Sequence, residues 1–205
     1  MMDSKSDLKQ RVARVQAVMA ERGIGGVIAF YGAQHNMLRL DPVLLLADYR
    51  VIGPAALLIP KSGEPSLILT PPWDLPRARE TVALSDIRAV EESALAEAIA
   101  KAAAKLPTPI ALTGREVMPL GFARELFRHL GGEPIDGGDV IRATASTRTQ
   151  VELERVAKAA TIADEGFRHL RETVRVGMRE YELAAELDTV MQALGAEDNF
   201  GLMST

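Results

Sequence analysis

The 205-residue chain contains no cysteine and only three histidines. Without cysteine it cannot form a disulfide, present a thiolate nucleophile or bind zinc through sulfur. Three histidines leave few general bases for a serine or threonine nucleophile, and nothing resembles the sharp turn that exposes such a nucleophile. Cysteine chemistry is therefore excluded, and a nucleophile triad is not indicated.

Long hydrophobic runs and clusters of positive charge are also missing. The longest apolar runs, PVLLLA and PAALLIP, are far too short to span a bilayer. Lys and Arg are spread along a chain of net charge −4, without the basic patch typical of nucleic-acid binding. The polar start, MMDSKSDLKQRV, has no signal-peptide pattern. We therefore expect a soluble, cytoplasmic protein that binds neither nucleic acid nor membrane.

Up to about residue 142, short apolar strands alternate with helices. A helix is predicted over about residues 7–22, then a buried strand over 26–30 and a hairpin around the KSGE loop. The segments that follow are predicted as helix, strand, helix, strand, helix and edge strand or turn: PPWDLPRARE, DIRAV, SALAEAIAKAAAKL, PIALTG, PLGFARELFRHLGG and EPIDGG. This alternation is typical of an α/β domain, and the hairpin makes its sheet mixed.

A different pattern begins after RATASTRTQ, residues 142–150, which is small, polar and aperiodic and predicts a linker. Beyond it, two helices carry apolar seams at steps of three and four residues. The seams are Leu153, Val156, Ala160, Ala163, Phe167, Leu170 and Val174, then Leu183, Leu187, Val190 and Leu194. The final DNFGLMST alternates enough to predict a strand. Two helices and a strand cannot bury these seams alone, so we expect the front part of a larger protein.

Two short acidic clusters are weak candidates for metal ligands. Glu165, His169 and Glu172 share a helix face, which we predict to be the solvated face opposite the seam. A metal-binding bundle would need a second such set on a facing helix, and the sequence offers none. In the DGGD motif, we predict a turn in which Asp139 caps the following segment.

The stretch from Tyr31 to Arg50 is the best candidate for a binding site. It is rich in polar and aromatic residues: Tyr31, Gln34, His35, Asn36, Arg39, Asp41, Asp48, Tyr49 and Arg50. It begins at the carboxyl end of a predicted central strand, where α/β domains usually bind ligands. The alternative is that these residues are ordinary loop polar groups and helix caps.

Three motifs resemble the creatinase, prolidase and aminopeptidase P family, whose catalytic domain has the pita-bread fold. Near the linker the matching residues are Arg142, Glu152 and Leu153, although TRTQ replaces the Lys-Ser-containing segment usual there. The Gly-x-x-Glu motif ahead of an Ala-Glu-Leu helix is matched by Gly177, Glu180, Ala185, Glu186 and Leu187. A Gly-Ala pair before a Phe-containing strand is matched by Gly195, Ala196 and Phe200.

The resemblance implies a fold and a domain organisation. Residues 1–142 would form a ribonuclease-H-like α/β domain, with a mixed sheet flanked by helices. Residues 143–150 would be a linker. Residues 151–205 would be the first helices and strand of an incomplete α+β pita-bread catalytic domain.

The same resemblance implies a chemistry that this segment does not carry. Family members hold two divalent metal ions with two Asp, one His and two Glu, and a metal-activated water attacks an amide or amidine carbon. Those ligands follow the strand that begins at Phe200, so no metal ligand or catalytic residue matches positions 1–205. The whole protein would use manganese, cobalt or zinc to cleave a C–N bond, whereas this chain would be inactive alone.

The resemblance further suggests substrates, partners and site residues. The substrate would be a Xaa-Pro peptide, or a guanidino or amide compound such as creatine or an ectoine-like molecule, and the protein a homodimer. The loop over residues 31–50 often reaches an active site in this family, frequently that of a partner subunit. Asn36 fits the family's Asn-x-x-Tyr pattern, whereas Arg39 stands where Tyr is usual and could meet a substrate carboxylate. We predict that His35, Asn36, Arg39 and Tyr49 bind the substrate.

Two alternatives from other classes stay open. The chain could be a non-catalytic binding or dimerisation module that associates through the seam over residues 153–174. It could also be an unrelated α/β protein that binds a small molecule, although this leaves the two helices after the linker unexplained.

Overall fold

The computed structural model describes residues 4–33 and 41–197, which belong to two compact units, residues 1–147 and 148–205. The first unit is built on a six-stranded sheet with the order β4-β3-β2-β1-β5-β6. The strands are β1 (Gly26–Tyr31), β2 (Ala55–Pro60), β3 (Ser66–Leu69), β4 (Asp86–Ala89), β5 (Ile110–Thr113) and β6 (Ile135–Asp136). The strand β2 is antiparallel to both its neighbours and all other pairs are parallel. The predicted mixed sheet is therefore confirmed.

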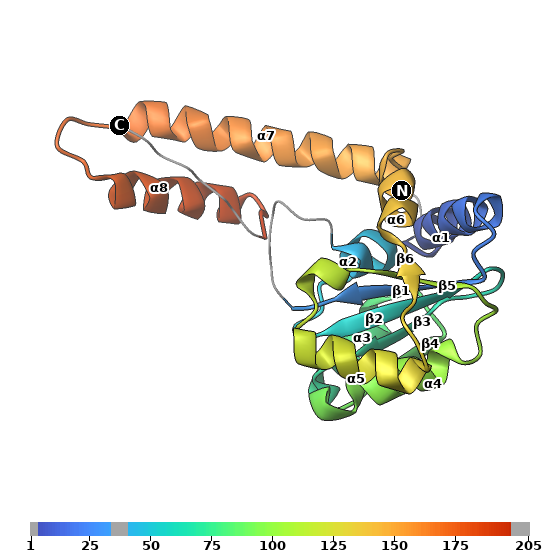
Figure 1. Cartoon of the computed structure of the whole chain (residues 1–205). Helices are drawn as coiled ribbons and strands as arrows, with labels where there is room; N and C mark the ends of the chain where they lie inside the picture. Colours follow the sequence, from blue (N-terminus) through green and yellow to red (C-terminus); the bar gives the residue numbers. More distant parts are fainter. Residues whose placement is uncertain (1–3, 34–40, 198–205) are drawn as a thin grey trace. The chain divides into compact units, whose positions relative to one another are not determined.

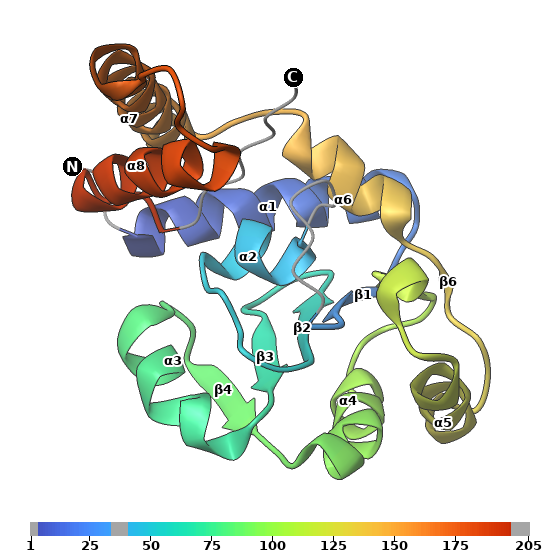
Figure 2. The same ribbon diagram turned by 90° about the vertical axis from the view of Figure 1, so that its left-hand side faces the viewer.

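Helices cover both faces of this sheet. Figures 1 and 2 show α1 (Ser4–Glu21), α2 (Pro42–Ala47) and α6 (Gly138–Ala145) on one face, with α4 (Leu95–Ala103) and α5 (Leu120–Leu130) on the other. The helix α3 (Leu75–Thr81) lies beside β4, and 3-10 turns precede α3 and α4 and follow β5: η1 (Pro72–Asp74), η2 (Glu92–Ala94) and η3 (Arg115–Val117). The flanked α/β architecture expected from the sequence is confirmed.

The alternation of side chains along the central strands creates two separate cores. Val27 and Ala29 of β1 contribute to the core under α1, α2 and α6, whereas Ile28 and Phe30 contribute to the core under α4 and α5. The Phe30 ring stacks on Phe122 of α5, with ring centroids 5.0 Å apart. Because β1 is buried along its whole length, its sequence is a continuous apolar run.

Two local predictions around residue 140 are wrong. The helix α6 continues to Ala145, so the first part of the predicted linker is helical. Asp139 does not cap this helix and instead pairs with Arg142 one turn on. The backbone N–H of Gly138 is bound by Asp136 Oδ1 at 2.9 Å, which is an Asx-type contact. The apolar residues Val140 and Ile141 explain the helix, because both are buried.

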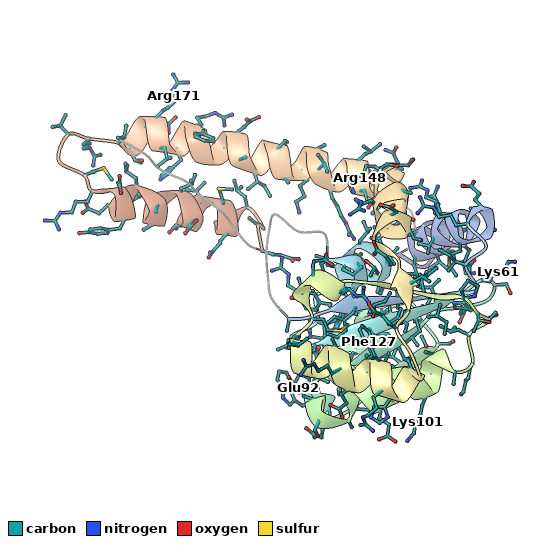
Figure 3. All side chains as sticks on the ribbon, in the orientation of Figure 1. Lys61, Glu92, Lys101, Phe127, Arg148 and Arg171 are labelled. Atoms are coloured by element: carbon teal, nitrogen blue, oxygen red, sulfur yellow. The ribbon has the colours of Figure 1, made fainter. Side chains whose placement is uncertain are left out.

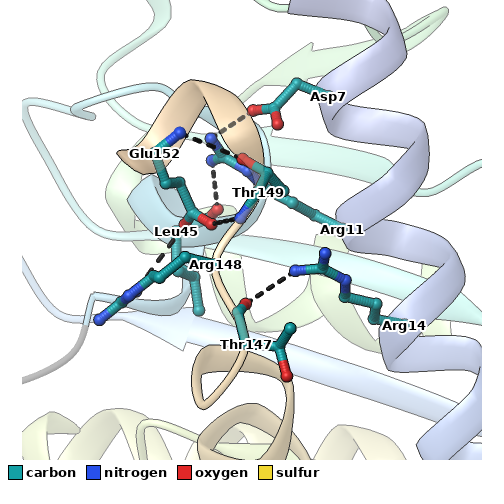
Figure 4. Close-up of polar contacts among 8 residues, drawn as sticks. All are labelled: Asp7, Arg11, Arg14, Leu45, Thr147, Arg148, Thr149 and Glu152. Carbon is teal, nitrogen blue, oxygen red and sulfur yellow. Dashed lines mark hydrogen bonds and ion pairs between the residues drawn. The ribbon is translucent and has the colours of Figure 1, made fainter. Parts of the chain in front are cut away.

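The second unit contains two antiparallel helices, α7 (Gln150–Thr173) and α8 (Glu180–Ala193) (Figure 1). A capping box starts α7: Thr149 Oγ1 accepts from the Glu152 N–H at 3.2 Å, and Glu152 Oε2 accepts from the Thr149 N–H at 2.7 Å (Figure 4). Both long helices are confirmed. The strand predicted over residues 198–205 lies outside the described residues.

The face that α7 presents to α8 differs from the predicted seam. Ile162 and Gly166 are the buried residues of α7. A Cβ on Gly166 would lie 2.7 Å from Leu187 Cδ1 and 3.0 Å from Met191 Cγ, so glycine permits the close approach of the helices. Four seam residues stay 50–65% exposed: Leu153, Val156, Phe167 and Val174. The long-helix prediction holds, but much of its apolar seam is uncovered.

A buried ion pair lies on α1 in the first unit. Asp7 and Arg11 are one helical turn apart, and their side chains are only 4% and 5% exposed. Arg11 Nη1 also donates to the backbone oxygen of Leu45 at 2.6 Å, one of the last carbonyls of α2 (Figure 4). Arg14, one turn further along α1, donates to the backbone oxygen of Thr147 at 2.7 Å. These arginines attach α1 to α2 and to the chain just after α6.

We predict that Asp7→Ala lowers the free energy of unfolding of the chain by about 3–5 kcal/mol, because it leaves the buried Arg11 charge unpaired. The measurement is chemical denaturation followed by circular dichroism. The control is Glu97→Ala, which breaks an i,i+4 pair with Lys101 on the outer side of α4 (Figure 3) and should change stability little. Equal effects of the two substitutions would contradict the prediction.

Candidate functional site

The carboxyl ends of four strands meet at one edge of the sheet. Tyr31 at the end of β1 pairs with Ala55 at the start of β2, and Ala55 pairs with Leu69 at the end of β3. Leu69 in turn pairs with Ala89 at the end of β4, and β5 runs parallel to β1. The loops after β1, before β2, after β3 and after β4 therefore gather at this edge. The prediction that the 31–50 stretch begins at the carboxyl end of a central strand is confirmed.

Of the four predicted substrate-binding residues, one can be placed. His35, Asn36 and Arg39 lie outside the described residues. Tyr49 lies in the loop between α2 and β2, and it is only 2% exposed. A direct contact of Tyr49 with a substrate stays a prediction, and the structure assigns this side chain a set of buried neighbours.

Two acidic residues of the same stretch serve the local backbone. Asp41 Oδ1 accepts from the N–H groups of Val43 and Leu44, at 2.8 and 3.0 Å, and so caps the start of α2. Asp48 ends α2 in the left-handed conformation, with φ of 54°, a role for which Asp is better suited than most residues. The alternative reading of this stretch, as loop groups and helix caps, therefore applies to these two positions.

Tyr49 lies beneath the guanidinium group of Arg77. The Arg77 Cζ atom lies 4.4 Å from the centroid of the Tyr49 ring, a cation–π distance. Arg77 Nε donates to Asp74 Oδ1 at 2.7 Å, and Nη2 donates to Asp74 Oδ2 at 3.1 Å. Arg77 Nη2 also donates to the backbone oxygen of Arg50 at 3.0 Å. We call Tyr49, Asp74 and Arg77 the Arg77 cluster; it joins the loop before β2 to the turn after β3.

Burial controls the electrostatics of the Arg77 cluster. Desolvation and, after it, the neighbouring Asp74 carboxylate raise the pKa of Tyr49 well above its usual value. The contact with Asp74 raises the pKa of Arg77 as well. At neutral pH the phenol of Tyr49 is therefore neutral and the guanidinium of Arg77 is charged. A neutral phenol of this kind is a poor base, whereas a held guanidinium suits binding of an anion.

The sequence reading did not select Asp74 or Arg77 as site residues. It predicted the PPWDLPRARE segment as a short helix after a proline, which the structure confirms as η1 followed by α3. The pattern that could have indicated this ion pair is Asp74 and Arg77, three residues apart in a helical segment after a strand. Such spacing occurs on many solvated helices, so only the buried position of Asp74 distinguishes it.

The candidate metal ligands in the second unit are arranged differently from the prediction. Instead of lying on a wholly solvated face, His169 is partly buried and its Nε2 lies 2.8 Å from Glu186 Oε2 of α8. Glu165 pairs with Arg168 on α7 itself. Across residues 4–33 and 41–197, no group of three or more His, Asp or Glu side chains could hold a metal ion. These residues do not fit a divalent metal centre.

No described helix combines the length and the apolar character needed to cross a membrane.

We predict that the alkaline titration of Tyr49 is coupled to unfolding. Its pKa is raised in the folded state, so this stabilisation is present below about pH 10, the usual tyrosine pKa, and is lost as pH rises through the higher folded value. The phenolate absorbance at 295 nm should show a late step that coincides with loss of circular dichroism. This step should be smaller in Tyr49→Phe, in which Tyr31, whose pKa is also raised by burial, still titrates late.

The matched control for this titration is Tyr181→Phe, which removes an exposed phenol from the second unit and should retain the late step. A late step of unchanged amplitude in Tyr49→Phe, or one reduced equally in Tyr181→Phe, would contradict the prediction.

Comparison with known proteins gives similarity at the level of the fold. No family model matches the chain, and no curated protein matches it significantly by sequence. The prolidase from Pyrococcus horikoshii OT3 superposes with a TM-score of 0.73 and 20% identity, over 92% of this chain and 50% of that one. The X-Pro aminopeptidase from Thermotoga maritima MSB8 gives a TM-score of 0.73 and 21% identity, over 91% and 50%.

A shorter structure also matches part of this chain. It is a Creatine_N superfamily domain of a dipeptidase from Streptococcus thermophilus, with a TM-score of 0.50 and 15% identity, over 64% of this chain and 96% of that one. The chain spans about half the length of the prolidase and aminopeptidase structures that it resembles. The resemblance inferred from the sequence is thus confirmed for the fold, and the chain has the architecture that prolidases and X-Pro aminopeptidases share over half of their length.

Proposed function

We propose that this chain is the N-terminal α/β domain and the beginning of the catalytic domain of a metal-dependent hydrolase that cleaves a C–N bond. The supporting observation is that one match extends over 92% of the chain, and so includes residues of both compact units. We assign residues 1–147 to the N-terminal domain and residues 148–205 to the opening of the pita-bread domain. The substrate would be a Xaa-Pro peptide or a small guanidino or amide compound.

In this proposal the first domain contributes to substrate recognition and the metal centre lies elsewhere in the protein. His35, Asn36, Arg39 and Tyr49 would recognise the substrate from the loops at the carboxyl edge of the sheet. The described residues contain no group of side chains that could hold the metal, so the proposal gives none of them a catalytic role. The whole protein would act as a soluble homodimer with manganese, cobalt or zinc.

The exposed apolar residues of α7 favour the same organisation. Leu153, Val156, Phe167 and Val174 are at least half exposed, and an amphipathic helix is stabilised mainly by burying its apolar face. A catalytic domain that contains α7 and α8 would cover this face with further structure.

We predict that the 205-residue chain does not hydrolyse Gly-Pro, Ala-Pro or creatine when manganese, cobalt or zinc is added. The reason is that a metal-activated nucleophile requires a set of protein ligands, which the described residues do not supply. Release of proline or amine is measured by chromatography, with buffer plus metal as the blank. A protein in which the proposed remainder of the catalytic domain follows this chain, called the longer protein below, should hydrolyse at least one of these compounds.

Either of two results would contradict the proposal. Robust metal-dependent turnover by the 205-residue chain would place the active centre within it. Absence of turnover by the longer protein, on all these compounds and with each metal, would remove the support for a hydrolase.

The second candidate, a non-catalytic binding or dimerisation module, is favoured by the same exposed face of α7. In that case Phe167 and its neighbours would form a contact between chains, and light scattering should give a mass that rises with concentration. Phe167→Gln should lower this association by removing the most exposed large side chain of the seam. The control is Arg171→Gln on the same helix (Figure 3). A monomer at all concentrations that binds no hydrophobic dye would argue against this candidate.

A further inference from the structure

Arg77 is held in place by three groups that are themselves fixed. Asp74 occupies the Nε and Nη2 donors, the backbone oxygen of Arg50 takes a second bond from Nη2, and the Tyr49 ring lies beneath the guanidinium plane. Asp74 and Tyr49 are only 1% and 2% exposed. A long side chain normally loses much conformational freedom when it binds a ligand, and here that freedom is already restricted in the free protein.

The Nη1 end of the Arg77 guanidinium group takes no part in these contacts. The Nη1 atom has two N–H donors, and the three hydrogen bonds that Arg77 donates to Asp74 and to the backbone oxygen of Arg50 use Nε and Nη2 instead. The Arg77 side chain is 48% exposed although its anchors are buried. A fixed and solvent-accessible N–H group on a permanent cation suits binding of a carboxylate.

The Arg77 cluster also lies at the edge where the proposed substrate-binding loops gather. Tyr49 precedes β2 and Asp74 follows β3, and these strand ends lie next to the carboxyl end of β1. The chain leaves β1 at Tyr31 and enters the segment with His35, Asn36 and Arg39.

We propose that Arg77 binds the carboxylate of the ligand at this edge, through Nη1, and that Asp74 and Tyr49 are positioning residues that hold its guanidinium. The inference rests on the proposed function, and it adds a residue: Arg77 is the group that recognises the free carboxylate of a dipeptide or a guanidino acid. An arginine that served only as a structural link between two loops would not distinguish a carboxylate from the corresponding amide.

The chain contains a matched comparison for Arg77. Arg88 on β4 also makes a two-bond contact with an aspartate, Asp86, and its side chain is 46% exposed. Asp86 is itself 40% exposed, and neither an aromatic ring nor a backbone oxygen holds the Arg88 guanidinium in the described structure. Arg88 therefore has the same charge and a similar exposure without the buried anchors.

The experiment titrates the 15N-labelled 205-residue chain with N-acetylproline and, separately, with N-acetylprolinamide. We expect the acid to shift the Arg77 Nε–H resonance and the backbone amides of residues 48–53, 70, 73–75 and 77 in a saturable way, and the amide to shift them far less. Arg77→Lys should weaken binding of the acid roughly tenfold, because it loses a fixed charge-assisted hydrogen bond. Arg88→Gln should bind the acid as the unmodified chain does.

The role of Tyr49 in positioning Arg77 is tested by comparing how strongly each variant prefers N-acetylproline to N-acetylprolinamide. Tyr49→Leu removes the ring beneath Arg77 and should reduce this preference, and Tyr49→Phe should restore it because the ring returns. Circular dichroism verifies that each variant is folded. The comparison of acid with amide on the unmodified chain needs no variant, so it decides the question even if Arg77→Lys fails to fold.

Three outcomes would overturn the inference: equal shifts by acid and amide, unchanged binding in Arg77→Lys, or equal weakening in Arg88→Gln. This failure is distinguishable from failure of the proposed function. Turnover by the longer protein that is insensitive to Arg77→Lys would reject the role of Arg77 and leave the hydrolase standing. Carboxylate binding without any turnover would reject the hydrolase instead.

Discussion

The pairing of β1 with its two neighbours is the constraint on which the first unit depends. All six residues of β1 are buried, the strand is hydrogen-bonded to β2 and β5, and its two faces contribute to different cores. A shift of register by one residue would move Val27 and Ala29 into the opposite core. The carboxyl end of β1 is therefore fixed, and with it the edge at which the surrounding loops meet.

The Arg77 cluster uses this fixed edge. Tyr49 and Asp74 are separated in the chain by the β2–β3 hairpin, yet the antiparallel pairing returns the end of β3 to the start of β2. The buried carboxylate of Asp74 requires a partner, and Arg77 supplies it while the Tyr49 ring covers the other side. These contacts attach the loop before β2 to the turn after β3. Burial also raises the pKa of the Tyr49 phenol, and its ring lies against the Arg77 guanidinium.

The second unit follows a different rule. The helix α7 begins with a capping box and packs on α8 through the small Gly166, but the apolar seam of α7 is left largely uncovered. Helical periodicity predicts which face of a helix is apolar, but it does not predict which segment or protein packs against that face. In the proposed hydrolase, the remainder of the catalytic domain would cover this seam.

Local patterns in the sequence were sufficient for the element types and for the mixed sheet, because apolar runs, helical spacing and a Gly-containing loop each act over a few residues. They also indicated the 31–50 stretch as the end of a central strand. The aperiodic composition of residues 142–145 led to the prediction of a linker there, but these residues are helical. The burial of Val140 and Ile141 starts a helix that continues to Ala145. The Asp139 cap failed because a side-chain contact with Arg142 competes with it.

Only the tertiary structure could bring Tyr49 beneath Arg77 or pair His169 with Glu186, since both contacts join residues from different elements. Sequence spacing encodes the face of a helix, whereas burial and partner choice arise when separate elements pack together.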